Sequence, residues 1–117
     1  MIADADVDFC YVTTTGRRTG KRHRIEIWFA AAPERDTIYL LSGGRDRADW
    51  VRNLRATPEC VVHLGARTYA SHARVIEGTD EDELARTLVH DKYAQGDDLA
   101  RWRAEALPVA IDLEVRT

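Results

Sequence analysis

Short runs of β-branched and aromatic residues, joined by tight turns, constrain this fold more than any other feature of the sequence. The runs occupy residues 9–15, 24–30, 37–41 and 107–115, together with both arms of a long hairpin at 59–77. Gly65 and Ala66 are the expected turn of that hairpin, where glycine supplies the positive φ of a type II′ turn. Because the connections are short, we expect the strands to pair antiparallel.

The segment after the third run favours a short helix. Asp46 is its expected N-cap, with Asp49 in the first turn, where a carboxylate is favourable beside the positive end of the helix dipole. Pro58 ends the helix. The apolar stripe of this helix consists of Trp50, Val51 and Leu54.

A second helix is expected from Thr79 or Asp80, and a looser helical stretch carries Leu99 and Trp102. The expected inner face of the second helix consists of Leu84, Ala85, Leu88 and Val89. About six antiparallel strands with two or three short helices indicate a mainly β (α+β) fold. We predict a small antiparallel barrel, because the βαβ alternation that parallel sheets require is absent.

Length and composition limit the classes of function. The chain, residues 1–117, is 44% hydrophobic and 32% charged, as expected for a single globular domain. No apolar run could span a bilayer, and the acidic N-terminus is unlike a signal peptide, so we expect a cytoplasmic protein. The histidines and cysteines lack metal-site spacing, so no metal is expected, and Cys10 and Cys60 are predicted to be reduced, buried thiols.

A basic turn interrupts this chain of net charge -3. Its cations are Arg17, Arg18, Lys21, Arg22 and Arg24. Gly16 and Gly20 bracket a turn whose backbone N–H groups could point inward together, and Thr19 adds a hydroxyl. Arginine binds carboxylate and phosphate through two parallel hydrogen bonds. The turn therefore predicts a site for a compact anion.

A second glycine-containing loop also has features that favour an anion. Ser42, Gly43, Gly44 and Arg45 stand shortly before an expected helix N-terminus, which favours anions. Glycines there would also let the backbone approach a flat ligand closely. The two loops together predict a pocket for a phosphate and a planar ring.

The basic turn has three other possible interpretations. The phosphate loop of nucleotide hydrolases is excluded, because GRRTGK has three residues between its glycines and Arg22 replaces the required Ser or Thr. Nucleic-acid binding is disfavoured, because no wider basic stripe accompanies the turn. Solvated hairpin charges that aid solubility are a further alternative.

Four motifs in this order resemble the deazaflavin-dependent nitroreductase family, which uses coenzyme F420. They are TTTGRRTGK, a strand ending in WF, LSGG, and DWVRNLRATPE, and the resemblance runs from about residue 11 to the final strand. It implies a split β-barrel of the flavin-binding superfamily. It also implies a cofactor-binding set of Arg17, Arg18, Thr19, Gly20, Lys21, His23, Ser42, Gly43, Gly44, Trp50 and Asn53.

The activity implied by the resemblance is hydride transfer from reduced F420 to a quinone, a nitro compound or an activated alkene. The cofactor carries this chemistry, so the protein must place it, exclude water and balance charge. Tyr93 matches a family tyrosine that could supply a proton, although an aromatic packed under the late helix is the alternative.

Two other functions stay open from the sequence. One is a non-catalytic protein that binds a cofactor or a lipid, and the other is an oxidoreductase that uses FMN, whose phosphate also needs arginines. The expected partner is a small-molecule electron acceptor, with no nucleic acid and no membrane span. Open sheet edges favour pairing between copies, so we also consider a homodimer.

Overall fold

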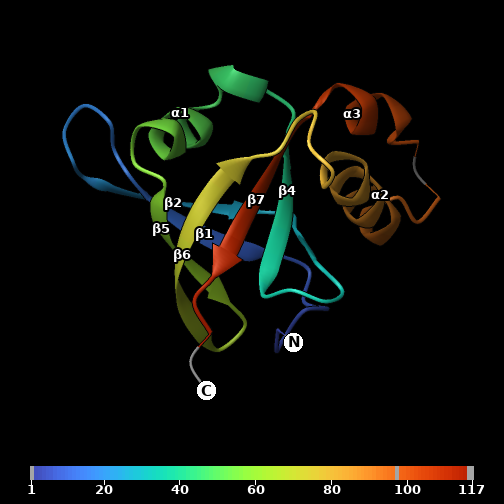
Figure 1. The fold of residues 1–117 in the computed structure, drawn as a ribbon, viewed down its shortest axis with the longest axis horizontal. Coiled ribbons are helices and arrows are strands. Elements are labelled where there is room, and N and C mark those ends of the chain that lie inside the picture. Colours follow the sequence, from blue (N-terminus) through green and yellow to red (C-terminus); the bar gives the residue numbers. More distant parts are fainter. Residues whose placement is uncertain (1, 97, 116–117) are drawn as a thin grey trace.

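The computed structural model describes residues 2–96 and 98–115, which form one antiparallel sheet with helices around it (Figure 1). The strands are β1 (Cys10–Thr15), β2 (Arg22–Ile27), β3 (Ala30–Ala31), β4 (Thr37–Ser42), β5 (Glu59–Leu64), β6 (Arg67–Val75) and β7 (Leu107–Leu113). The helices are the 3₁₀ turn η1 (Arg45–Arg47), α1 (Asp49–Ala56), α2 (Asp82–Tyr93) and α3 (Ala100–Glu105).

The sheet has the strand order β2-β1-β5-β6-β7-β4-β3, so its two edge strands follow one another in the sequence. Only Trp28 and Phe29 separate β2 from β3, and two residues cannot bridge more than about 11 Å between the flanking Cα atoms. The sheet must therefore curl until its edges approach at this bend. The predicted mainly β split barrel is confirmed, with seven strands in the described residues instead of about six.

The prediction of one continuous strand over 24–30 is wrong at this bend. The chain pairs with β1 up to Ile27, and after two residues it pairs with β4 from Ala30 onward. Phe29 is completely buried while Trp28 stays 37% exposed. A single straight strand could not reach both neighbours, because three strands separate β1 from β4 in the sheet order.

Side-chain alternation places the main core inside the curled sheet. In β1, Cys10, Val12 and Thr14 are buried, while the residues between them are half-buried. In contrast, β4 is buried along its whole length, because α2 packs against it. Figure 1 shows α2 and α3 together on one side of the molecule, with α1 on the other.

The predicted N-cap of the first helix is wrong. Asp46 lies in η1, and α1 begins at Asp49 with Ala48 at the N-cap and no side-chain cap. The Asp46 carboxylate instead accepts two hydrogen bonds from Arg55, at 2.9 and 2.6 Å. The 3₁₀ turn delays the helix because Ser42 Oγ bonds the Arg45 carbonyl oxygen and closes a tight turn before it.

The second helix begins at Asp82, two or three residues later than the expected start at Thr79 or Asp80. Ala85 and Val89 face the core as predicted, whereas Leu84 is 40% exposed, so its assignment to the inner face is wrong. The predicted hairpin turn is confirmed, because β5 and β6 are joined by two residues and Gly65 has a φ of 60°.

Cys10 and Cys60 are buried free thiols, as predicted. Burial raises the pKa of each thiol from 9.0 to about 12. Within residues 2–96 and 98–115, no cluster of His, Cys, Asp and Glu is arranged to hold a metal ion. None of the helices in the same residues combines the length and hydrophobicity needed to cross a bilayer.

Candidate functional site

The basic turn is the six-residue loop that joins β1 to β2. Thr15 pairs with Arg22 at the base of the loop, and the Gly16 N–H donates to the Lys21 carbonyl at 2.7 Å. The Gly20 N–H donates to the Gly16 carbonyl at 2.9 Å, and Gly20 has a φ of 74°. These bonds fix a closed loop in which Gly20 adopts a conformation that costs other residues energy.

Gly16 is required at its position for another reason, which is close packing. A Cβ on this residue would lie 2.8 Å from Nε2 of His23 and 2.9 Å from the Lys21 carbonyl oxygen. The His23 ring therefore lies directly against the backbone of the turn, in the space that a side chain at residue 16 would fill.

Two residues of helix α1, Asp49 and Asn53, hold the basic turn in place. The Arg17 N–H and Nη1 both donate to Oδ1 of Asn53, at 3.2 and 2.8 Å, and Nη2 donates to Asp49 at 3.1 Å. Nδ2 of Asn53 in turn donates to Oγ1 of Thr14 in β1, at 3.2 Å. Asn53 is only 4% exposed, so its hydrogen bonds are shielded from solvent, whereas the contact between Arg17 and Asp49 is exposed.

Most backbone donors of the turn are already used by these contacts. The N–H groups of Gly16, Arg17 and Gly20 are bonded as described, and the Lys21 N–H donates to Oγ1 of Thr19 at 3.3 Å. The two glycines of the turn had predicted that backbone N–H groups bind the anion. In the structure, the cationic side chains are the groups left for that task.

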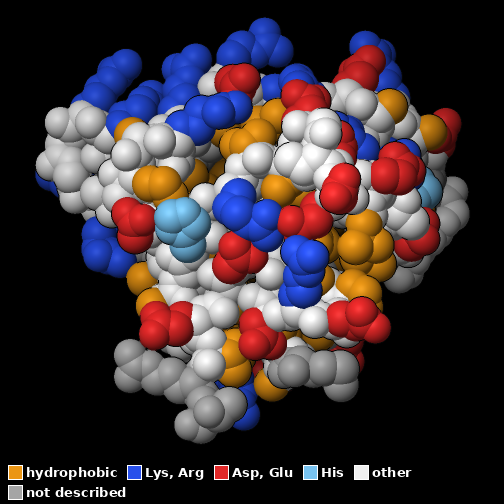
Figure 2. Space-filling view, viewed as in Figure 1, with side chains coloured by type: hydrophobic (Ala, Val, Ile, Leu, Met, Phe, Trp, Pro, Cys, Tyr) orange, Lys and Arg blue, Asp and Glu red, His pale blue; other side chains and the backbone are white. Residues whose placement is uncertain are grey.

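An open groove of about 730 Å³ runs between the turn and α1. It is lined by Thr14, Gly16, Arg17, Arg18, Thr19, Lys21, Arg22, His23, Arg24, Ile25, Asp49, Trp50 and Asn53. Arg18, Lys21 and Arg22 are exposed and make no ion pair with any described residue. Figure 2 shows Lys and Arg side chains gathered along the upper edge of the molecule, on the side of this turn and α1.

The remaining cations of the turn have partners within the protein. Arg17 is held by Asn53 and Asp49, and the Arg24 guanidinium lies 4.4 Å from the centre of the Tyr11 ring. The Tyr11 hydroxyl donates to Glu26 at 2.7 Å, and this hydrogen bond raises the pKa of Tyr11. The five cations thus divide into two structural ones and three that are available to a ligand.

The groove brings together seven of the residues predicted to bind the cofactor. These are Arg17, Arg18, Thr19, Lys21, His23, Trp50 and Asn53, and Gly20 belongs to the same turn. Ser42, Gly43 and Gly44 do not line this groove; they follow β4, and Figure 1 shows α1 and η1 between that end of β4 and the basic turn.

The glycine loop has its own structural contacts. A Cβ on Gly43 would lie 3.5 Å from Cδ1 of Trp102. Arg45, which follows with a φ of 53°, donates to the Glu105 carbonyl and to both carboxylate oxygens of Glu77, each at 2.6 Å. The loop is therefore tied to α3 and to the segment that precedes α2.

Tyr93 lies at the bend that closes the barrel. Its hydroxyl accepts from the Phe29 N–H at 3.0 Å and lies 2.7 and 3.0 Å from the carbonyl oxygens of Asp8 and Phe29. Burial raises the pKa of Tyr93 to about 12. Because the single hydroxyl proton faces two backbone acceptors, the geometry favours a structural role, and a role as proton donor stays a prediction.

An aromatic cluster covers the same bend. The Trp28 ring stacks on Tyr93 with a centroid distance of 4.3 Å and an interplanar angle of 2°. Trp102 meets Trp28 edge-on at 5.7 Å. This cluster holds α2 and α3 against the bend, and Trp50 lies elsewhere, half-buried against the main core.

Several residues that line the groove are absent from the cofactor-binding set predicted from the sequence. Arg22 and Arg24 belong to the cation run, which was itself the available signal. Thr14 could have been found from the strand alternation, which points it inward beside Asn53. Nothing in the sequence indicated that Asp49 would face Arg17, because that contact depends on where α1 begins.

Several solved structures share this fold. An F420-H2 dependent reductase (FDR-A) is 23% identical with a TM-score of 0.72, over 92% of this chain and 94% of that one. A domain-swapped dimer is 24% identical with a TM-score of 0.71, over 92% and 80%. The heme storage protein HutZ from Vibrio cholerae is 14% identical with a TM-score of 0.72, over 93% and 83%.

A search of curated protein sequences returned no match. The profile of the F420H(2)-dependent quinone reductase family matches residues 5–114, which is nearly the whole chain. This match agrees with the motifs of the basic turn, the glycine loop and α1. The chain therefore belongs to the F420H(2)-dependent quinone reductase family and is an F420-dependent reductase, an oxidoreductase.

Proposed function

We propose that this protein transfers a hydride from reduced F420 to an electron-poor acceptor, such as a quinone, a nitro compound or an activated alkene, and holds the acidic cofactor tail in the basic groove. The observation that carries the proposal is the groove itself. Three cations that form no ion pair within the described part of the chain, Arg18, Lys21 and Arg22, line it together with a half-buried aromatic ring, Trp50.

The groups present fit the cofactor that the family implies. Coenzyme F420 carries a phosphodiester and a chain of glutamates, and the free cations of the turn are complementary to both. A groove of about 730 Å³ is within the size range of cofactor sites. Each exposed contact contributes only about 0.2–1 kcal/mol, so affinity requires several of them together with burial of the ring.

The chain's own residues bind the cofactor and orient it. When bound, the deazaflavin supplies the hydride, because it has carbon in place of the flavin N5 and favours two-electron transfer. Arg17 and Asn53 fix the position of the turn, and Arg18 and Lys21 hold negative charge at its surface. We assign the glycine loop, Ser42–Gly44, to the far end of the same cofactor, as the resemblance implies.

Two alternatives differ from this proposal in measurable ways. A carrier would bind F420 or a lipid without turnover, and an FMN enzyme would prefer FMN. Titration of the purified protein with F420, FMN and heme, followed by fluorescence or absorbance, ranks the three ligands. Consumption of reduced F420 with menadione as acceptor then tests catalysis. Tight F420 binding without turnover over a broad acceptor panel would favour the carrier.

A pair of double variants tests the position of the tail. Arg18→Ala with Lys21→Ala removes two free cations of the groove, and we expect F420 affinity to fall about twofold to thirtyfold, less at high salt. Arg67→Ala with Arg101→Ala removes the same charge from the start of β6 and from α3, and should leave affinity unchanged. Equal affinity of both double variants would refute the tail site.

We also propose that the protein forms a homodimer. Strands β2 and β3 are edge strands, which offer unpaired backbone groups to a second copy. One of the similar structures is a domain-swapped dimer. Sedimentation velocity over a range of concentrations tests this proposal, and a single monomeric species at high micromolar concentration would contradict it.

A further inference from the structure

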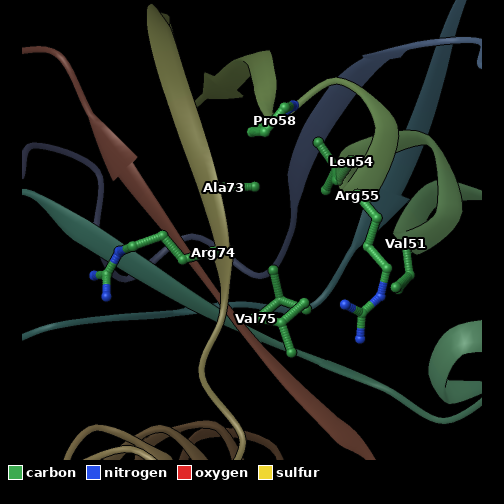
Figure 3. Close-up of a pocket in the computed structure, with 8 residues that line it drawn as sticks. Val51, Leu54, Arg55, Pro58, Ala73, Arg74 and Val75 are labelled. Carbon is green, nitrogen blue, oxygen red and sulfur yellow. The ribbon is translucent and has the colours of Figure 1, made fainter.

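A second cavity, of about 320 Å³, lies between α1 and the sheet (Figure 3). Its apolar walls come from Val51, Leu54 and Pro58 on the helix side and from Ala73, Val75 and Val109 on the sheet side. An engineered cavity of about 150 Å³ with similar aliphatic walls accepts benzene. The space here is open to solvent on one side and about twice as large, so two fused rings fit with one edge exposed.

The cavity has one polar group aimed into it. Figure 3 shows the Arg55 side chain descending beside Val51 toward Val75, whereas Arg74 extends to the opposite side of its strand. Arg74 is occupied there by Asp112 and Glu81. Arg55 uses Nε and Nη2 on one Asp46 oxygen, which leaves Nη1 without a partner among the described residues.

From this arrangement we propose that the cavity is a second small-molecule site for a bicyclic or similarly compact apolar ligand, and that it prefers an anion such as an aromatic carboxylate over a neutral ligand of the same size. The apolar body fills the space between α1 and β6, and the carboxylate accepts a charge-assisted hydrogen bond from Arg55 at the rim. A neutral hydrocarbon of the same size fills the cavity equally well but gains nothing from Arg55.

The site is separate from the basic groove. Helix α1 turns Trp50 and Asn53 toward the groove and Val51, Leu54 and Arg55 toward the cavity. The two ligands would therefore lie on different faces of one helix. Binding in the cavity does not depend on the cofactor proposal, and the two proposals can fail independently.

The test uses 2-naphthoate and its neutral counterpart 2-naphthylmethanol as probes, with amide chemical shifts and probe fluorescence as readouts. We expect saturable binding of both, with shifts at Val51, Ala73 and Val75. Arg55→Gln should weaken 2-naphthoate about threefold to tenfold and leave 2-naphthylmethanol unchanged. The matched control is Arg52→Gln. Arg52 lies on the same helix outside the cavity, so this substitution should change the affinity for neither probe.

Two further variants separate the site from its surroundings. Ala73→Leu fills the cavity, so it should abolish binding of both probes in a protein whose spectrum shows that it is folded. Arg18→Ala with Lys21→Ala should leave both affinities unchanged, because those cations lie in the groove. Three results would each overturn the proposal. They are chemical-shift changes confined to the β1–β2 turn, a 2-naphthoate affinity of Arg55→Gln equal to that of the wild type, and no saturable binding at millimolar probe.

Discussion

Arg17 and Asn53 connect the β1–β2 turn to helix α1 through a single oxygen atom. Both the backbone N–H and Nη1 of Arg17 donate to Oδ1 of Asn53, at 3.2 and 2.8 Å, while the Asn53 Nδ2 reaches Thr14. The first arginine of the basic cluster is thus used for position, and Arg18, Lys21 and Arg22 are left for a ligand. The turn is rigid where it meets α1 and cationic where it meets solvent.

Asn53→Ala should separate the turn from the helix. It leaves the donors of Arg17 and the hydroxyl of Thr14 without their buried partner, which costs about 1–3 kcal/mol in the free energy of unfolding. F420 affinity should fall as well, because the turn loses its anchor. Urea unfolding and F420 titration measure the two effects. Arg52→Ala, exposed on the same helix, should change stability by less than about 0.5 kcal/mol. Unchanged F420 affinity in a destabilised Asn53→Ala protein would contradict the positioning role.

Gly16→Ala should disturb the turn from inside. Its Cβ would lie within 2.9 Å of both the His23 ring and the Lys21 carbonyl oxygen, and the carbonyl belongs to the backbone and cannot swing away. We expect a loss of about 1–3 kcal/mol in stability, as for other overpacked positions. Gly43→Ala is the comparison, because its Cβ meets Trp102 at an ordinary 3.5 Å. If thermal unfolding showed the two variants equally stable, the packing explanation would be wrong.

Tyr93→Phe separates the structural role of the hydroxyl from a chemical one. The Phe29 N–H would lose its acceptor at the bend, so stability should fall by about 1–3 kcal/mol. Turnover of reduced F420 with menadione should stay at the wild-type rate at a temperature where the variant is folded. A fall of a hundredfold or more in kcat, with F420 affinity intact, would instead support Tyr93 as the proton donor.

The sequence predicted the strands well, because their alternation and turns are local signals. The hairpin at Gly65 and the final run were found from a few neighbouring residues each. The bend at Trp28 and Phe29 was missed, because it depends on pairing with both β1 and β4, which is a property of the closed sheet. Local alternation of Ile25, Ile27 and Phe29 gave no sign that the pairing partner would change.

The candidate site was also predicted only in part from the sequence. The basic turn and the α1 residues Trp50 and Asn53 were identified from motifs, and the structure brings them into one groove. The division of labour among the cations could not be predicted. Whether Arg17 binds a ligand or Asn53 depends on a contact between residues 36 apart in the sequence. Helix α1 likewise begins after the turn that the Ser42–Arg45 hydrogen bond closes, and not at Asp46, the predicted N-cap.

The buried thiols should make stability depend on alkaline pH. Below pH 9 the Cys10 and Cys60 thiols are neutral in both folded and unfolded chains, so their contribution is fully present. Between pH 9 and about 12 the unfolded chain releases these protons while burial keeps them on the folded chain. The free energy of unfolding should therefore fall as pH rises, by at most about 1.4 kcal/mol per pH unit for each thiol. Urea unfolding under reducing conditions from pH 8 to 9.5 measures the slope where the thiols contribute more than the tyrosines, whose ordinary pKa is 10.0. Cys10→Ala and Cys60→Ala should each reduce this slope, whatever their stability at pH 8. Parallel curves for wild type and both variants would show that the thiols do not cause the fall in the free energy of unfolding.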